Sequence, residues 1–309
     1  MKVYVTGHKG LVGSALFEVF QNKGYDVITS SKEEVNFLNM TEIVNFLEKH
    51  KPDVVILSAA RVGGINFNMN NPATMGYENG LITLNSLESC HRVNIKKVIY
   101  LGSSCIYPKH CPQPMKEEYL LTGTFEPTNE LYALAKCLGV KLVEGYNKQY
   151  GHDWFSVQPC NITGPNDNFS KINSHFFSAN VRKIYEAKEN NLTELVCWGD
   201  GSAKRELLYS LDLADSIEFL LNNYKENSLV NVGMGIDHTI KEYIEILCEI
   251  IGFNGKIVWD TTKPNGMQQR LLNIDKLNKL GWTYKTDVKL IGKIVYSWFL
   301  NNKGKYNDN

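Results

Sequence analysis

Three short segments of the chain carry side chains that could move protons on a sugar. Ser103 and Cys105 lie in the run Gly-Ser-Ser-Cys-Ile-Tyr, and His175 ends the run Asn-Ser-His. Tyr132 and Lys136 form a Tyr-x-x-x-Lys pair. A serine with such a pair can move a proton on or off an oxygen while hydride moves at the attached carbon. A thiol and an imidazole could move protons at carbons next to a ketone, so one site could epimerise a keto sugar and then reduce it.

The spacing of the Tyr–Lys pair predicts how it works. Residues four apart share one face of a helix, so the Lys136 ammonium would lie beside the Tyr132 phenol. A tyrosine phenol has a pKa of about 10, and a neighbouring positive charge lowers it toward neutral pH. Such pairs also occur on ordinary surface helices. Here the pair follows a glycine loop and a predicted strand that ends in Gly-Ser-Ser, which favours the catalytic interpretation.

The composition is typical of an enzyme with a substantial core. The chain has 309 residues, 43% of them apolar, and its 33 basic and 33 acidic residues balance. This balance leaves no overall charge to attract nucleic acid or an anionic membrane, so we expect neither partner. Seven scattered cysteines without a Cys-x-x-Cys pair favour reduced thiols and no metal site. With no signal-peptide pattern at the start, these features predict a cytoplasmic protein.

Short apolar runs alternate with helical patterns in the first half of the chain. Continuous apolar runs at 3–5, 54–57 and 98–101 are typical of strands that helices cover on both faces, and 155–158 is a weaker candidate. Helical periodicity follows the first run and recurs over residues 41–50. This order predicts an α/β fold of the Rossmann type, a doubly wound parallel sheet with ligands at the carboxyl ends of its strands.

The regular alternation of strand and helix patterns weakens in the second half of the chain, which predicts two domains that bind different ligands. We expect residues 1–165 to form the dinucleotide-binding domain, with a return segment near 210–235. Residues 166–309 would form mainly a smaller C-terminal substrate-binding lobe.

A glycine loop, Gly7-x-x-Gly10-x-x-Gly13, follows the first predicted strand and opens the first predicted helix. Glycines there permit a tight turn and let backbone N–H groups approach a pyrophosphate at the helix N-terminus. The spacing differs from Gly-x-Gly-x-x-Gly, and a plain strand-to-helix turn is the alternative. Its position at the first strand favours dinucleotide binding.

The end of the second predicted strand indicates which dinucleotide binds. NAD enzymes usually place an acidic residue there for the ribose 2′-hydroxyl. This chain has Ser30, Ser31 and Lys32 instead, with no acid before Glu33. Hydroxyls and a cation suit a 2′-phosphate, and Lys9 could add a second positive charge. The segment therefore predicts NADP(H), with a solvated loop as the alternative.

The chain resembles the extended short-chain dehydrogenase/reductases and, within them, the GDP-L-fucose synthase family. The resemblance runs over nearly the whole chain, and its most specific segments are Ser-Ser-Cys-Ile-Tyr-Pro-Lys and Asn-Ser-His. Its other segments are 7–15, 59–65, 126–130, 132–136, 167–169 and 198–201.

The resemblance implies a role for each of these side chains. Tyr132 would donate a proton to the C4 oxygen, Lys136 would lower the pKa of Tyr132 and hold the nicotinamide ribose, and Ser103 would polarise the C4 carbonyl. Cys105 and His175 would be base and acid of a C3/C5 epimerisation, with a core thiol and a structural histidine as the alternatives. NADPH would contact Gly7, His8, Lys9, Gly10, Leu11, Val12, Gly13, Ser30, Ser31, Lys32, Ala59, Ala60, Arg61, Leu101, Gly102, Ser103, Tyr132, Lys136, Pro159, Asn161, Ile162 and His175. The GDP-linked 4-keto sugar would contact Lys183, Trp198, Arg205 and Asn265.

Several segments depart from the family pattern and leave the exact sugar open. Asn-Leu-Tyr-Gly-Pro becomes Asn161-Ile162-Thr163-Gly164-Pro165, and residues 205–212 and 263–266 also differ. The main expectation is a bifunctional epimerase–reductase. The alternative is a dedicated C4 reductase, for example of a heptose for a surface polysaccharide. Less favoured is a 4-epimerase or 4,6-dehydratase, since a dehydratase usually follows the serine with an Asp-Glu pair where this chain has Ser104-Cys105. A non-catalytic NADP-sensing protein is also less favoured, because both Tyr132 and Lys136 are present.

The resemblance also implies a homodimer. The expected contact pairs the helices near Ile82–Val93 and Tyr132–Gln149.

Overall fold

The computed structural model describes residues 1–171, 173–263 and 267–306. Its main element is a six-stranded sheet in which all neighbouring strands are parallel. From edge to edge the strands are β10 (Leu229–Val232), β5 (Phe155–Pro159), β4 (Lys97–Leu101), β3 (Val54–Leu57), β1 (Lys2–Val5) and β2 (Asp26–Ile28). The four predicted apolar strands are therefore confirmed, including the weaker candidate at 155–158.

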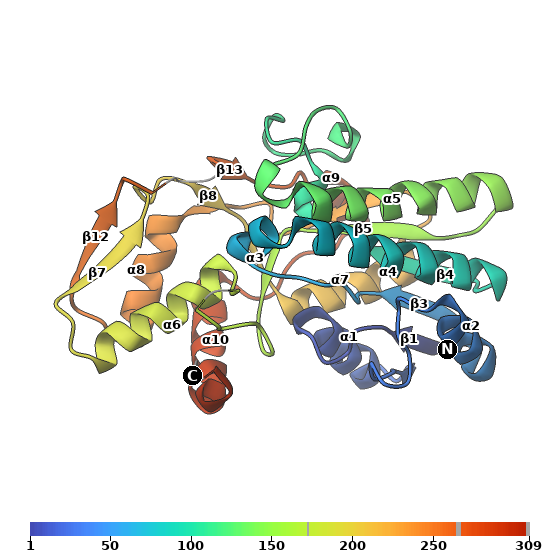
Figure 1. Cartoon of the computed structure of the whole chain (residues 1–309), viewed down its shortest axis with the longest axis horizontal. Helices are drawn as coiled ribbons and strands as arrows, with labels where there is room; N and C mark the ends of the chain where they lie inside the picture. Colours follow the sequence, from blue (N-terminus) through green and yellow to red (C-terminus); the bar gives the residue numbers. More distant parts are fainter. Residues whose placement is uncertain (172, 264–266, 307–309) are drawn as a thin grey trace.

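Helices cover both faces of this sheet (Figure 1). One face packs against α1 (Leu11–Asn22) and α7 (Ser210–Asn223); the other packs against α2 (Met40–His50), α4 (Pro72–Arg92) and α5 (Glu130–Tyr150). Successive side chains of a strand point to opposite faces. Val3 and Val5 accordingly pack with α1 and α7 in one core, whereas Tyr4 packs in the other. This arrangement confirms the predicted doubly wound α/β fold.

The order of the strands reverses at β1, which lies between β2 and β3. In doubly wound sheets, ligands bind beyond the carboxyl ends of the strands at such a switch point. The glycine loop directly follows β1, so the fold brings it to this edge.

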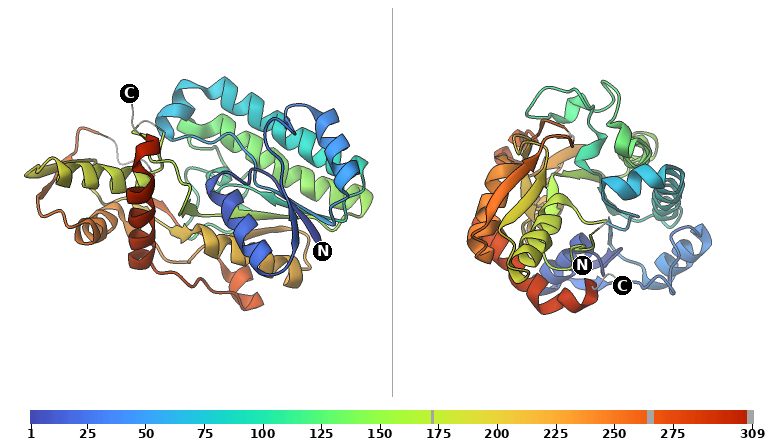
Figure 2. Two further views of the ribbon diagram at one scale, coloured as in Figure 1. Left: turned by 90° about the horizontal axis from the view of Figure 1, so that it is seen from below. Right: turned by 60° about the vertical axis from the view of Figure 1, so that its left-hand side comes forward.

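A smaller lobe lies beside the large sheet, at the left in Figure 1 and again in Figure 2. Its helices are α6 (Phe176–Glu189), α8 (Ile240–Ile251) and α10 (Val288–Asn302). Three small sheets accompany them. They are β7 (Glu194–Trp198) with β12 (Lys256–Asp260), β8 (Lys204–Arg205) between β11 (His238–Thr239) and β13 (Gln269–Arg270), and β6 (Asn161–Thr163) with β9 (Leu207–Tyr209). Short helices α3 (Ile65–Asn70) and α9 (Asp275–Leu280) complete the helices longer than one turn in these described ranges.

Glu206 links this lobe to the large sheet. Its carboxylate is fully buried and accepts the backbone N–H groups of Gly235, at 2.7 Å, and Leu272, at 2.9 Å. Burial raises the pKa of Glu206 to about 7, although these hydrogen bonds act in the opposite direction. Since Gly235 follows β10 and Leu272 follows β13, this one side chain fixes the strands that carry Arg205 and Arg270 against the sheet.

Within the described ranges, no helix combines the length and apolar character needed to cross a membrane. The seven cysteines are free thiols.

Candidate active site

The carboxyl end of β4 positions Ser103. Gly102 passes so close to Gln158 on β5 that a Cβ at position 102 would lie 2.3 Å from Gln158 Oε1. The same Oε1 accepts the backbone N–H of Ser103 at 3.1 Å. A side chain at position 102 would therefore displace the Gln158 amide from its hydrogen bond to Ser103.

Helix α5 brings the Tyr–Lys pair to this point. The buried Lys136 Nζ donates to the carbonyl of Leu101 at 2.8 Å and lies 5.2 Å from the centre of the Tyr100 ring. Burial lowers the pKa of Lys136 to about 8. The Tyr132 hydroxyl hydrogen-bonds with the Ser103 side chain. Burial raises the pKa of Tyr132, contrary to the lowering by Lys136 that the resemblance implies, because the ring is removed from water.

Cys105 lies in a single helical turn just after Ser103. Its thiol donates to Ser103 Oγ at 3.1 Å, and the side chain is buried. Burial raises the pKa of Cys105, whereas the Ser103 hydrogen bond and the positive charges of Arg270 and Lys136 oppose that rise. Three of the five predicted catalytic side chains thus meet around the Ser103 hydroxyl, and the positive charge of a fourth, Lys136, acts on the Cys105 thiol.

The fifth predicted catalytic residue, His175, immediately precedes α6 and is exposed. The turn before it packs against the segment after β3, since a Cβ on Gly64 would lie 3.0 Å from the carbonyl oxygen of Ser174. The imidazole interacts electrostatically with the buried Asp167 carboxyl. His175 therefore lies at the start of α6, and no hydrogen bond or ion pair among the described residues joins it to the group around Ser103.

The glycine loop makes a turn that tolerates no side chain at Gly13. A Cβ there would lie 2.1 Å from the carbonyl oxygen of Gly7. The contact presses the start of α1 onto the turn, and Leu11 and Val12 begin the helix after Gly10. The first N–H groups of α1 therefore lie at the carboxyl edge of the sheet, where a pyrophosphate can bind. His8 is half-buried in this turn and Lys9 is exposed.

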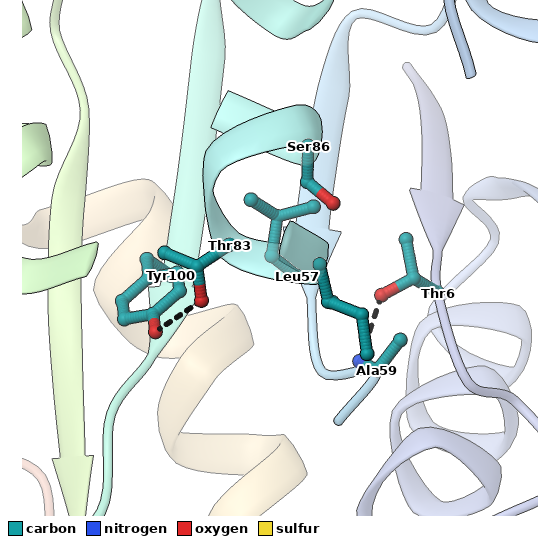
Figure 3. A pocket seen from close by; sticks show the side chains of 7 residues that line it. Thr6, Leu57, Ala59, Thr83, Ser86 and Tyr100 are labelled. Carbon is teal, nitrogen blue, oxygen red and sulfur yellow. Dashed lines mark hydrogen bonds between the residues drawn. The ribbon is translucent and has the colours of Figure 1, made fainter. Parts of the chain in front are cut away.

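The neighbouring loop after β3 is tied to β1 beneath the glycine loop. The Thr6 hydroxyl accepts the N–H of Ala59 at 2.9 Å, beside a cavity of about 10 Å³ (Figure 3). The Thr83 and Tyr100 hydroxyls hydrogen-bond at 3.2 Å on the cavity's other side. The cavity is far too small for a nucleotide, so a bound dinucleotide would lie outside it.

The side chains of the segment after β2 differ in their exposure to solvent. Ser30 is buried, and its hydroxyl hydrogen-bonds to the Tyr4 hydroxyl at 2.5 Å. Ser31 is half-buried and Lys32 is exposed. The positive charges of Lys9 and Lys32 both act on Glu33, so these two lysines lie close together. Lys32 and Lys9 are thus the groups that remain available to a 2′-phosphate, whereas the Ser31 hydroxyl accepts the N–H of Glu34 at 3.3 Å and hydrogen-bonds with Glu33.

Other predicted cofactor residues lie along the same edge. Ala60 and Arg61 follow β3, and Arg61 forms an ion pair with Glu78 at 2.8 Å. Pro159 ends β5, and Ile162 belongs to the adjoining β6. Asn161 is anchored by a 2.9 Å hydrogen bond from its amide to the Glu206 carbonyl.

The predicted substrate residues lie on the smaller lobe. Lys183 on α6 donates to the carbonyl of Val196. Trp198 is 62% exposed at the end of β7, and Lys263 Nζ lies 5.7 Å from its ring centre. Arg205 Nη1 donates to the carbonyl of Met267 at 2.7 Å, and burial lowers the pKa of Arg205 to about 10. Asn265 lies outside the described residues.

Sequence reasoning missed Arg270. Arg270 on β13 pairs in register with Arg205 on β8, so both side chains leave the same face of this small sheet. Its Nε is buried and has no hydrogen-bond partner among residues 1–171, 173–263 and 267–306, while Nη2 contacts Met267 Sδ at 2.9 Å. A two-residue strand has no periodicity, so no sequence signal places Arg270 beside Cys105 and Arg205.

Comparison with known proteins gives the family. The family model described as the NAD dependent epimerase/dehydratase family matches residues 3–233. The chain is 42% identical to the GDP-L-fucose synthase of Sinorhizobium fredii, over 97% of this chain and 96% of that relative. The chain belongs to the GDP-L-fucose synthase family. The resemblance predicted from the sequence is thereby confirmed.

Solved structures resemble this GDP-L-fucose synthase family member over nearly its whole length. A GDP-mannoheptose C4 reductase from Campylobacter jejuni with NADP bound is 31% identical, with a TM-score of 0.88 over 97% of this chain and 98% of that chain. A GDP-L-fucose synthetase from Naegleria fowleri bound to NADP is 27% identical, with a TM-score of 0.91 over 99% of this chain and 95% of that chain. Both neighbours hold the dinucleotide that the segment after β2 predicts.

Ser31→Asp tests whether this segment selects the cofactor. We expect the wild type to bind NADPH more tightly than NADH, and the variant to lose about tenfold or more in NADPH affinity because a carboxylate repels a 2′-phosphate. Titration followed by nicotinamide fluorescence measures both affinities. Ser31→Asn, which has the same shape without the charge, is the control. Equal affinity of the wild type for both cofactors would exclude this segment from ribose recognition.

Proposed function

We propose that this chain reduces the C4 ketone of a GDP-4-keto-6-deoxy sugar with NADPH, after epimerising the sugar at C3 and C5. The observation that carries the proposal is the meeting of Cys105 and Tyr132 at the Ser103 hydroxyl, with the Lys136 ammonium bonded to the Leu101 carbonyl at the same carboxyl edge of the sheet. Residues 1–165 with the segment near 210–235 would bind the dinucleotide, and residues 166–309 mainly the sugar nucleotide.

Reduction uses Ser103, Tyr132 and Lys136. NADPH, when bound, supplies a hydride to C4. The C4 oxygen then needs a proton, which the Tyr132 phenol donates while Ser103 hydrogen-bonds to the same oxygen. Burial raises the pKa of Tyr132 and so keeps the phenol protonated until it is needed. The Lys136 ammonium beside it stabilises the phenolate that proton donation leaves behind.

Epimerisation uses the remaining pair. The C4 ketone acidifies the hydrogens at C3 and C5, and inversion requires removal of a proton from one face and its return to the other. Cys105 comes from the large domain and His175 from the smaller lobe, which suits opposite faces of one sugar ring. Cys105 must act as a thiolate, and Lys136 and Arg270 supply the positive charge that this needs.

The smaller lobe offers a cationic and aromatic surface for the GDP moiety. Arg205 and Arg270 leave the same face of their sheet, which suits a diphosphate between them. Lys183 adds a third cation on α6, and the exposed Trp198 ring offers a flat surface for the base. Asn265, outside the described residues, completes the proposed set.

A dedicated C4 reductase is the second candidate. It is favoured by the 31% identity to the Campylobacter reductase, which the chain covers almost completely. It also agrees with the altered substrate segments, such as Thr163 in place of a tyrosine. In that case a separate enzyme would epimerise the sugar, for example a heptose destined for a capsule or other surface polysaccharide. Either function suits a cytoplasmic enzyme with seven free thiols.

The outer face of α4 and α5 is the proposed homodimer contact. Exposed apolar side chains gather on these two helices: Tyr77, Leu84, Leu131, Leu134, Leu138 and Tyr150. The spacing 131, 134 and 138 places three leucines on one helix face. The overlap with the helices expected from the family resemblance supports a homodimer through this face.

Replacing Leu134 with glutamate tests the dimer. We expect the wild type to run at twice its chain mass of 35.1 kDa in light scattering, and Leu134→Glu to run as a monomer because a buried charge has no partner there. Leu300→Glu on α10, also an exposed leucine, is the control and should stay dimeric. A monomeric wild type would contradict the proposal.

Tyr132→Phe tests the proton donor. Only the hydroxyl is lost, so we expect NADPH affinity to stay nearly unchanged and the reduction rate to fall by about 10²- to 10⁴-fold. The assay follows NADPH absorbance with a GDP-4-keto-6-deoxy sugar. Tyr119→Phe, which alters a tyrosine in the short helical turn Glu117–Tyr119, serves as the control. Turnover at the wild-type rate would remove Tyr132 from the mechanism.

Cys105→Ser and His175→Asn separate the two reactions. In D₂O we expect the wild type to exchange deuterium into C3 or C5 of the keto sugar, as seen by NMR. Each variant should lose most of this exchange yet still reduce a sugar that already has the product configuration. A wild type that reduces such a sugar rapidly but exchanges no deuterium would establish the dedicated reductase instead.

A further inference from the structure

The side chain of Gln158, at the carboxyl end of β5, makes a single hydrogen bond within the described ranges. It is fully buried, and its Oε1 accepts the backbone N–H of Ser103 at 3.1 Å. Its Nε2 is also buried and has no hydrogen-bond partner in the part of the chain that the structure describes. Burying an amide whose N–H groups have no partner costs stability, so folding alone does not favour glutamine at this position.

Gln158 can reach Ser103 because the residue beside it is a glycine. The parallel strands β4 and β5 pair Leu101 with Val157, so Gly102 and Gln158 follow as the next neighbours. The N–H of Gly102 still donates to the carbonyl of Val157 at 2.9 Å. The Gln158 amide therefore occupies the space beside Gly102 that a Cβ at position 102 would need.

A second buried amide holds the other end of the same turn. Asn231 on β10 pairs in register with Gln158, so both side chains leave the same face of the sheet. The Asn231 Oδ1 accepts the Tyr107 hydroxyl at 2.6 Å. Residues 103–107, which include Cys105, are thus held at Ser103 by one amide and at Tyr107 by the other.

The two amides differ in what else they hold. The Nδ2 of Asn231 donates to the carbonyls of Met115, at 2.9 Å, and Asn273, at 3.0 Å. Asn231 therefore joins several segments of the fold, and its loss would disturb all of them. The one hydrogen bond of Gln158 serves Ser103 alone.

This bond completes the fixation of Ser103 on both sides of its α-carbon. The N–H of Ser103 is bonded to Gln158, and its carbonyl accepts the N–H of Ile106 at 3.0 Å. The Ser103 hydroxyl in turn contacts the Cys105 thiol at 3.1 Å and the Tyr132 hydroxyl. Loss of the Gln158 acceptor would free the first of the two peptide groups and let the hydroxyl move away from both partners.

We propose that Gln158 is a positioning residue that sets the Ser103 hydroxyl for its contact with the sugar C4 carbonyl. The inference rests on the proposed function and extends it to a side chain outside the catalytic group. Because Gln158 acts through the backbone of Ser103, it should affect the rate of the chemical step more than the binding of cofactor or sugar nucleotide.

Serine NMR tests the contact without requiring catalysis. The amide signal of Ser103 in ¹⁵N-serine-labelled enzyme is identified by its absence in Ser103→Ala. Gln158→Met keeps the length of the side chain without the acceptor, so we expect the Ser103 amide proton to move upfield as its hydrogen bond is lost. Gln158→Glu keeps an oxygen acceptor and replaces only the unpartnered Nε2, so its Ser103 signal should not move upfield.

Reduction kinetics then test the role of the contact. With NADPH and a GDP-4-keto-6-deoxy sugar, we expect kcat of Gln158→Met to fall by about 10- to 100-fold while the KM for the sugar nucleotide changes little. Gln158→Glu should recover most of the loss. Asn147→Leu is the control, because it removes an amide that bonds to the backbone of Trp154 just before β5. This variant should melt at a lower temperature without a change in kcat or in the Ser103 signal.

An unchanged kcat in folded Gln158→Met, or a fall that Gln158→Glu does not recover, would overturn the inference. Should Gln158→Met not fold, Gly102→Ala provides the test, since its Cβ would displace the same amide from Ser103. We again expect an upfield shift and a lower kcat, and an unchanged Ser103 signal would overturn the inference.

The two measurements separate this inference from the proposed function. A wild type that reduces the sugar, with an equally fast Gln158→Met, keeps the function and rejects the positioning role. A wild type that does not reduce the sugar rejects the function, whereas an upfield shift in Gln158→Met would still establish the Gln158–Ser103 contact.

Discussion

The hydrogen bond from Lys136 to the carbonyl of Leu101 aligns the two halves of the catalytic group. One partner lies on α5, which carries Tyr132, and the other is the last residue of β4, which leads to Ser103 and Cys105. The 2.8 Å contact therefore fixes a phenol from a helix against a hydroxyl and a thiol from a loop. The carbonyl and the Tyr100 ring stabilise an ammonium that burial would otherwise strongly disfavour.

Burial at the Ser103 hydroxyl raises the pKa of both neighbouring acidic groups, but this has different consequences for the two. It raises the pKa of Tyr132 and of Cys105. In the proposed mechanism this suits Tyr132, which would donate its proton, but hinders Cys105, which would have to lose its proton first. The positive charges of Lys136 and Arg270 offset this penalty for Cys105. Arg270 and His175 both belong to the smaller lobe, so the proposed site needs side chains from both lobes. Glu206 holds β8 and β13, the strands that carry Arg205 and Arg270, against the large sheet.

Much of the fold and part of the candidate site could be predicted because their signals are local. Continuous apolar runs identified the buried parallel strands, and four-residue spacing placed Tyr132 and Lys136 on one helix face. The segment after β4 then brought Ser103 and Cys105 to the same point, as the predicted ligand-binding edge implies.

The features that the sequence did not predict depend on contacts between distant segments. Ser30 stands where a ribose-binding residue is expected, yet its hydroxyl faces Tyr4 in the neighbouring strand. Arg270 lies on a strand too short for any pattern, and only its pairing with β8 brings it beside Arg205. Asp167 belongs to one of the segments that resemble the family, but its bond to Ser178 requires α6 to pack beside the loop that follows β6. No spacing rule within one segment reports such contacts.

Transfer of deuterium from C4-deuterated NADPH is the most direct test of the central claim, that this site reduces a sugar ketone at C4. The enzyme would be given a GDP-4-keto-6-deoxy sugar and the labelled cofactor in H₂O, and the product would be analysed by NMR. The account predicts one deuterium at C4 of the sugar, in a single configuration, and none at C3 or C5. A product that carries no deuterium at C4, with the label retained on the cofactor, would contradict it.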